Sequence, residues 1–187
     1  MEETIKIFVE KITSYNIFNN LLPGIIFCFA LNHTTRFNIG TDNILENIFI
    51  YYFVGIVVSR IGSLVIEDLL RKIKIKNKTT KKKETFLIFS NYSDYVDASE
   101  NQETIKILSE MNNTYRTLTA LFSSLAIVKI YEIVLHDFLL KTIGENIISS
   151  LLFVLLAIMF VFSYRKQTAY ISKRVEKYKK ENQGEKL

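Results

Sequence analysis

The alternation of apolar and basic segments constrains the fold of this chain more than any other feature. Four apolar segments, 17–31, 44–66, 118–135 and 147–164, separate five polar pieces. The fourth segment runs for 18 residues without a charged side chain, close to the length of about 20 apolar residues that a spanning helix needs. A core helix of a soluble protein would carry a polar stripe instead. The sequence therefore predicts an all-α, four-helix transmembrane protein.

The basic residues predict the orientation. If every segment crosses a bilayer, the N-terminal piece, the middle piece and the C-terminal piece lie on one side. They hold 2, 10 and 8 of the 24 Lys and Arg residues, whereas each short connection on the other side holds one. An excess of positive charge marks the cytoplasmic side. We therefore expect a multi-pass protein of a bacterial inner membrane with both termini in the cytoplasm.

The pattern divides the chain into five parts. They are an N-terminal amphipathic interfacial helix (1–16), a first transmembrane hairpin (17–66), a cytoplasmic polybasic loop and helix (67–117), a second transmembrane hairpin (118–164) and a basic cytoplasmic C-terminal helix (165–187). An unbroken helix over 100–135, capped by Asp97 or Ser99, would span about 54 Å and project beyond the bilayer. We therefore predict helical cytoplasmic extensions of the transmembrane part.

The first apolar segment contains the only proline of the chain. Pro23 lacks a backbone donor and Gly24 loosens the helix. The sequence predicts a helix break at these two residues, with a crossing that is tilted, re-entrant or shielded by its neighbours.

Four ionisable residues fall within the apolar segments: Glu46, Arg60, Lys129 and Glu132. A charge in a spanning helix costs about 2.5–3.5 kcal/mol on insertion scales and suggests a function. We predict an outer polar layer of Glu46, Lys129 and Glu132, with Arg60 alone nearer the inner surface. Two interpretations stay open, structural pairing of these charges and a water-lined path.

Small residues recur at every fourth position on two of the predicted helices. Gly55, Ser59 and Ser63 follow this spacing on the second helix, and Ala120 and Ser124 follow it on the third. Such spacing lets helices approach closely in lipid. The close partner of the second helix is either the third helix or another copy of the chain, and a conducting path would require a homo-oligomer because four helices enclose no wide pore.

A run of eight basic residues without an acidic one covers 71–83. It is either a contact with anionic lipid headgroups or a flexible loop that fixes the topology. Nucleic acid is not the expected partner, because the basic residues flank membrane segments. The headgroup contact would use Arg71, Lys72, Lys81, Lys82 and Lys83.

Catalytic signatures are absent from the sequence. The two histidines, His33 and His136, stand in no metal-ligand or triad spacing, and no glycine-rich phosphate loop occurs. We therefore expect a protein that is not an enzyme and holds no metal or cofactor.

Three stretches give the chain a likeness to a known group: YNIFNNLLPG at 15–24, SRIGS at 59–63 and NNTYRT at 112–117. Together with the layout, they resemble small four-pass membrane proteins of bacterial anti-phage loci, namely accessory membrane proteins of RNA-targeting CRISPR systems and membrane effectors of nucleotide-signalling defence. The resemblance covers most of the chain in architecture and carries over no site residue. It implies a membrane-perturbing effector or a regulator of a soluble partner.

Three functions are compatible with this pattern. The first is an oligomeric, pore-like membrane effector in antiviral defence that is gated through its cytoplasmic part. The second is a non-conducting membrane anchor that docks a soluble partner on 84–117. The third and lowest-ranked is a small transporter that would use the broken helix and Arg60 for an anion.

Overall fold

A computed structural model describes residues 16–76, 83–134 and 145–184. These residues are mostly helical, so the predicted all-α class is confirmed at this level. The elements, in which η denotes a π-helical turn, are η1 (Ile17–Leu21), α3 (Leu22–Thr34), α4 (Ile44–Ile61), η2 (Gly62–Ile66), α5 (Glu67–Lys72), β1 (Lys74–Lys76), β2 (Lys83–Thr85), α6 (Tyr92–Asn101), α7 (Glu103–Val134) and α9 (Glu145–Gly184).

Two helical stretches among the described residues are long and apolar enough to cross a membrane. They are Ile44–Lys72, which joins α4, η2 and α5, and Glu103–Val134, which is α7. Each contains one of the segments that the sequence predicts to cross. The other two predicted segments lie in η1–α3 and in the first half of α9. The chain is thus compatible with membrane insertion by length and composition.

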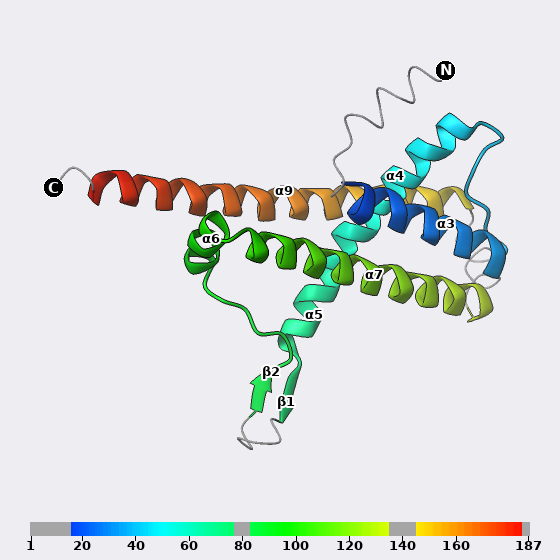
Figure 1. Ribbon diagram of the computed structural model, residues 1–187. Helices are drawn as coiled ribbons and strands as arrows, with labels where there is room; N and C mark the ends of the chain where they lie inside the picture. Colours follow the sequence, from blue (N-terminus) through cyan, green and yellow to red (C-terminus); the bar gives the residue numbers. More distant parts are fainter. Residues whose placement is uncertain (1–15, 77–82, 135–144, 185–187) are drawn as a thin grey trace.

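The helix α4 is the centre of the arrangement, because it contacts α3, α7 and α9. Figure 1 shows α4 crossing the other helices obliquely before it continues through α5 into the strands. The core lies where α4 meets α7 and contains the buried residues Val58, Ala120 and Leu121. Partly buried side chains complete it, namely Ile26, Phe27, Val54, Ile61, Ile66 and Leu125.

Two glycines bring the continuous helix η1–α3 into backbone contact with α4. A Cβ atom placed on Gly24 would lie 1.7 Å from the carbonyl oxygen of Tyr51, and one placed on Gly55 would lie 1.7 Å from that of Asn20. Neither space admits a methyl group. The residue Gly24, interpreted from the sequence as a loosening element, therefore serves to pack two helices together, and Gly55 has its partner in the neighbouring helix of the same chain.

The predicted helix break at Pro23 and Gly24 is wrong. The helix continues from η1 into α3, and the residues at the junction keep helical angles. The π-helical turn explains the continuity. The Leu22 N–H donates to the Ile17 carbonyl, one residue further back than in an α-helix, and this wider turn accommodates the ring and missing donor of Pro23.

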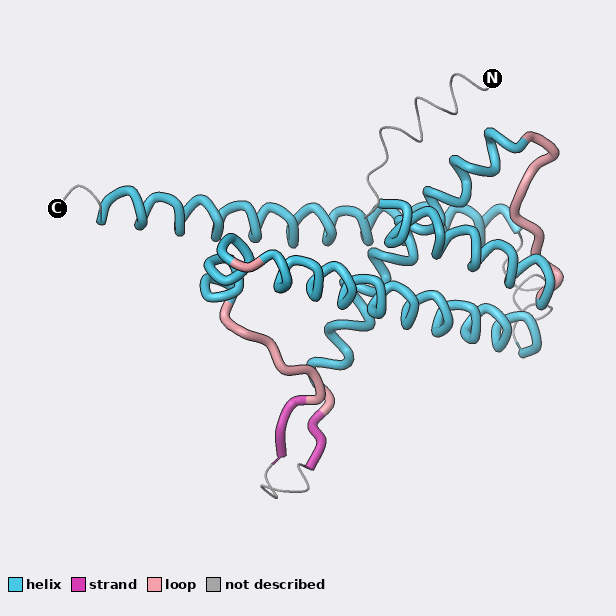
Figure 2. Tube along the Cα trace, in the orientation of Figure 1, coloured by secondary structure: helices cyan, strands magenta, loops and turns pink. Residues whose placement is uncertain are grey.

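A short antiparallel hairpin replaces part of the predicted polybasic loop. In β1 and β2, Lys74 pairs with Thr85, Ile75 with Glu84 and Lys76 with Lys83. The hairpin projects away from the helices, as the two magenta strands of Figure 2 show. Alternation of Lys and Ile favours an extended strand, which helical periodicity alone did not indicate.

The predicted cap of the third long helix is also wrong. The residues Asp97 and Ser99 lie inside α6, and α7 begins at Glu103. Gln102 separates the two helices because its backbone is extended, with φ −135° and ψ 107°. The separate helix α6 can therefore fold back onto α7 and α9, which it contacts.

Several predictions fall outside the described residues. These are the amphipathic interfacial helix except Asn16, the headgroup contacts of Lys81 and Lys82, and the end of the C-terminal helix beyond Gly184.

Candidate functional site

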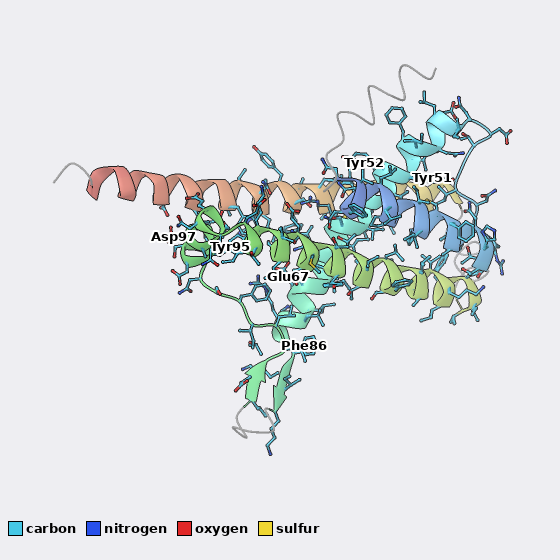
Figure 3. All side chains as sticks on the ribbon, in the orientation of Figure 1. Tyr51, Tyr52, Glu67, Phe86, Tyr95 and Asp97 are labelled. Atoms are coloured by element: carbon cyan, nitrogen blue, oxygen red, sulfur yellow. The ribbon has the colours of Figure 1, made fainter. Side chains whose placement is uncertain are left out.

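A cluster of charges surrounds Glu67 where α5, α7 and α9 meet, a position labelled in Figure 3. The Glu67 side chain is only 8% exposed. Its carboxylate accepts hydrogen bonds from Arg71 and Arg116, each at 2.8 Å. The Lys166 ammonium lies 3.7 Å from the same carboxylate. One carboxylate thus faces three cations from three helices, and we call these four residues the Glu67 junction.

The turn η2, which directly precedes Glu67, helps to position Lys166 and Arg116 beside it. The residue Glu67 follows the π-helical turn η2, whose Gly62 lies against α7, with the Arg116 carbonyl 3.1 Å from where a Cβ would lie. On α9, the Lys166 ammonium also donates to the Ser63 carbonyl at 2.7 Å and contacts the Ser63 hydroxyl at 3.0 Å. The absence of a side chain at Gly62 therefore lets α7 come close enough for Arg116 to reach Glu67.

Burial shifts the ionisation of the junction on the α9 side. Burial lowers the pKa of Lys166, and the attraction of Glu67 opposes this effect. One turn further along α9, burial raises the pKa of Tyr170. Both shifts follow from the packing of this part of α9 against Ser63 and Tyr92, which removes water from the two side chains.

Aromatic contacts connect the Glu67 junction and the adjoining part of α9 to α6 and to the segment just before it. The guanidinium of Arg71 lies over the Phe89 ring at 3.9 Å. In α6, Tyr92 stacks on Tyr170 with ring centroids 5.5 Å apart, and its hydroxyl donates to the Tyr170 carbonyl at 3.3 Å. The buried Val96 adds an apolar contact surface on α6. We call α6 with the adjoining halves of α7 and α9 the stem.

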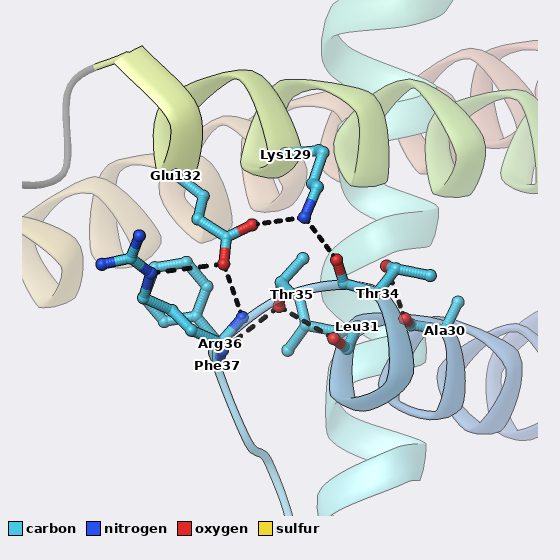
Figure 4. A network of polar contacts seen from close by, with 8 residues as sticks. All are labelled: Ala30, Leu31, Thr34, Thr35, Arg36, Phe37, Lys129 and Glu132. Atoms are coloured by element: carbon cyan, nitrogen blue, oxygen red, sulfur yellow. Dashed lines mark hydrogen bonds and ion pairs between the residues drawn. The ribbon is translucent and has the colours of Figure 1, made fainter.

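A second polar cluster lies at the C-terminal ends of α3 and α7, away from the Glu67 junction (Figure 4). The Glu132 carboxylate accepts from Lys129 at 2.7 Å, from the Arg36 backbone N–H at 2.6 Å and from Arg36 Nε at 3.3 Å. The Lys129 ammonium also donates to the Thr34 carbonyl at 2.5 Å. This network fastens the loop after α3 to the end of α7 and satisfies the carboxylate.

The structure brings together only part of the predicted outer polar layer. Lys129 and Glu132 are in contact, whereas Glu46 lies exposed at the start of α4, where it accepts from Asn43 at 3.4 Å. The partner that joins Lys129 and Glu132 is Arg36, from the loop. Arg60 is half-buried in the last turn of α4 and has no hydrogen bond or ion pair among the described residues.

The small residues predicted to mediate helix packing lie on the inner faces of α4, η2 and α7. Gly55, Ser59 and Ser63 are buried, as is Ala120, while Ser124 is half-buried. Ala120 lies near Gly62 of η2, with its Cβ 3.4 Å from where a Gly62 Cβ would lie. These contacts occur within one chain, so the small residues account for intrachain packing.

Of the predicted headgroup residues, three lie in the described part of the chain. Lys72 and Lys83 are exposed, in α5 and β2. Arg71 is engaged with Glu67 and Phe89 and is therefore a structural residue as well.

Glu67, Arg116 and Lys166 are not among the site residues that the sequence patterns predict. A signal was present, because each stands within three residues of the end of a predicted apolar segment, at the ends that the charge pattern predicts to lie on one side. Residues at equal depth on neighbouring helices can meet, which makes opposite charges at such positions candidates for pairing.

We expect the substitution Glu132→Gln to release the loop after α3. Loss of the carboxylate weakens the bond to the Arg36 N–H, so hydrogen exchange at this amide should accelerate by about tenfold or more. Exchange mass spectrometry in detergent measures the effect, and Glu46→Gln is the matched control because Glu46 lies apart from the network. Unchanged exchange at Arg36 in the Glu132 variant would refute the fastening role of this cluster.

The fold and its two polar clusters define a helical protein with stretches capable of crossing a membrane, and the ends of these stretches are fastened by ion pairs in which the Glu67 and Glu132 side chains are buried. Comparison with family models, with curated proteins and with solved structures gives no match. Among the described residues, no group of three or more His, Cys, Asp or Glu side chains is placed to hold a metal ion.

Proposed function

We propose that this protein is a four-pass inner-membrane protein that acts as an oligomeric effector of membrane permeability, gated through its stem. The observation that carries the proposal is the Glu67 junction. It ties α5, α7 and α9 together at the ends of the apolar segments that the positive-inside pattern assigns to the cytoplasmic side. A change in the stem would therefore act on three membrane helices at once.

Close packing within one chain favours an assembly of several copies as the conducting unit. The contact of the helix η1–α3 with α4 at Gly24 and Gly55 leaves no space for a methyl group, and the α4–α7 contact holds a buried apolar core. Large apolar side chains of α7 point outward, with Ile133 72% exposed and Ile127 66% exposed. Such faces suit contact with lipid or with another copy.

A role in antiviral defence rests on the resemblance of the layout to membrane proteins of anti-phage loci. The protein would then permeabilise the membrane of an infected cell when a signal reaches the stem. Phage plating on bacteria that express the chain with its neighbouring genes, compared with the same genes lacking it, tests this part of the proposal.

Dye release from liposomes tests the permeability function. We expect release to rise faster than linearly with protein density, because conduction requires several copies. The substitution Tyr92→Ala, which removes the contact of α6 with α9, should change the density at which release begins. The matched control is Tyr115→Ala, since Tyr115 is 62% exposed on α7. Tight liposomes with both wild type and Tyr92→Ala at every density would contradict the effector function.

A non-conducting anchor is the second candidate, and one observation favours it. Apolar side chains are exposed in the region 84–117, which would lie outside the bilayer. Ile88 is 86% exposed, and the first half of α7 carries an apolar stripe that consists of Ile107, Leu108, Met111 and Tyr115. Such a surface fits a soluble protein partner. Tight liposomes together with capture of a partner that Ile88→Asp and Leu108→Asp abolish would establish the anchor instead.

A further inference from the structure

An apolar groove lies between the helical stretch Ile44–Lys72 and α9. Its volume is about 780 Å³, within the range of about 300–1,000 Å³ that is usual for small-molecule sites. One wall is formed by α4, η2 and α5, and the other by the first half of α9. The groove is lined mainly by aliphatic and aromatic side chains, among them Val57, Leu64, Leu152, Leu155, Ile158 and Phe162.

The α9 wall of the groove is exposed. Leu152, Leu155, Ile158 and Phe162 are each between 51% and 61% exposed within the described part of the chain. A continuous apolar surface of this kind is unfavourable in water and marks a place that another apolar group covers. In a bilayer, the nearest such groups are acyl chains.

Charged side chains lie at one end of the groove, where α9 leaves its apolar segment. Asp68, Arg165 and Lys166 line this end. Arg165 is exposed, and its side chain has no hydrogen bond or ion pair among the described residues. Lys166 also faces Glu67, so the adjoining Glu67 junction belongs in the charge count: four cations (Arg71, Arg116, Arg165 and Lys166) stand against two carboxylates (Glu67 and Asp68), and this end of the groove carries a net positive charge. Positive charge beside an apolar channel matches a molecule that has an anionic head and an apolar tail.

We propose that the groove binds an anionic phospholipid, with one acyl chain between α4 and α9 and the phosphate on Arg165 and Lys166. The site differs from the basic run at 71–83, because it combines a hydrocarbon channel with the headgroup contact. The proposal rests on the proposed membrane function, since a phospholipid reaches the groove from the bilayer. Binding of the phospholipid would make the position of α9 depend on the lipid composition of the membrane.

Photolabelling tests the lipid site. The full chain is reconstituted in phosphatidylcholine vesicles that contain phosphatidylglycerol with a photoreactive diazirine on its acyl chain. We expect the label in the peptide that covers 152–162. Arg165→Gln should lower this labelling about fivefold, the effect of one surface charge on anionic lipid, and Asp68→Asn should raise it. Leu155→Trp should lower it by filling the groove without a change of charge.

Controls separate this site from general membrane attraction. Lys106→Gln removes an exposed cation of α7 outside the groove and should leave the labelling unchanged. Diazirine-bearing phosphatidylcholine should label the same peptide several-fold less. Equal labelling by both lipids, or labelling that the three groove variants leave unaltered, would overturn the proposal. Cross-linking of Ile158→Cys to a second copy in place of lipid labelling would overturn it as well.

Flotation with the vesicles distinguishes failure of the proposed membrane function from failure of the lipid site alone. A chain that does not float with lipid contradicts the proposed membrane function itself. A chain that floats without a label in 152–162 contradicts the lipid site alone.

Discussion

We expect the replacement of Glu67 with Gln to lower the free energy of unfolding by about 3 kcal/mol, the low end of the cost of breaking a buried ion pair. The variant leaves Arg71, Arg116 and Lys166 clustered without their counter-charge. The lower end applies because the Arg71 side chain is 46% exposed and water screens part of the repulsion.

Thermal unfolding in detergent, followed by circular dichroism, measures the loss for the Glu67 variant. A fall of about 6–12 °C in melting temperature corresponds to this energy for a chain of this size. The matched control is Asp68→Asn, because Asp68 is the neighbouring carboxylate, is exposed and lies outside the hydrogen bonds of the junction. Equal melting temperatures for the two variants would show that the junction adds no stability.

Alanine at Gly24 or at Gly55 is expected to force the helix η1–α3 away from α4 and to cost about 3 kcal/mol. The added methyl group would lie 1.7 Å from a backbone carbonyl oxygen, and no rotation of a side chain relieves this overlap. Overpacking of a tight core costs about 1–3 kcal/mol, occasionally more. The higher helix propensity of Ala returns less than about 1 kcal/mol, so the strain dominates.

The substitution Gly62→Ala provides a graded control for the two glycine variants. Its Cβ would lie 3.1 Å from the Arg116 carbonyl and 3.4 Å from the Ala120 side chain, a tight but adjustable fit. We expect a smaller loss of melting temperature than at Gly24 or Gly55. If Gly24→Ala and Gly55→Ala unfold at the wild-type temperature, the backbone contact between α3 and α4 is not part of the stable fold.

Local spacing made several features of this protein predictable from its sequence. The apolar segments coincide with helices, and the three-residue separation of Lys129 and Glu132 placed the two charges on one helical face, where they pair. The recurrence of small residues at every fourth position correctly indicated which face of α4 packs inward. Each of these inferences depends on one element at a time.

The Glu67 junction could not be derived in this way, because its members come from segments that are about 50 and 100 residues apart in sequence. The role of Gly24 was hidden by the adjacent Pro23, whose effect on a helix is the stronger local signal. The wider turn of η1 removes that effect, and the glycine then acts through a neighbour that no local pattern reveals.

The continuity of α9 has a mechanical consequence. As one helix of 40 residues, it measures about 60 Å from end to end. The Lys166 contact with Ser63 and Glu67 divides this rod into arms of about 32 Å and 27 Å. A straight helix that is held near its middle pivots about that contact, so its two ends move in opposite directions. A sideways push of about 5 Å on its basic end would swing the opposite end by about 6 Å in the other direction, so a small force on the C-terminal part would move the apolar first half of α9 without bending the helix.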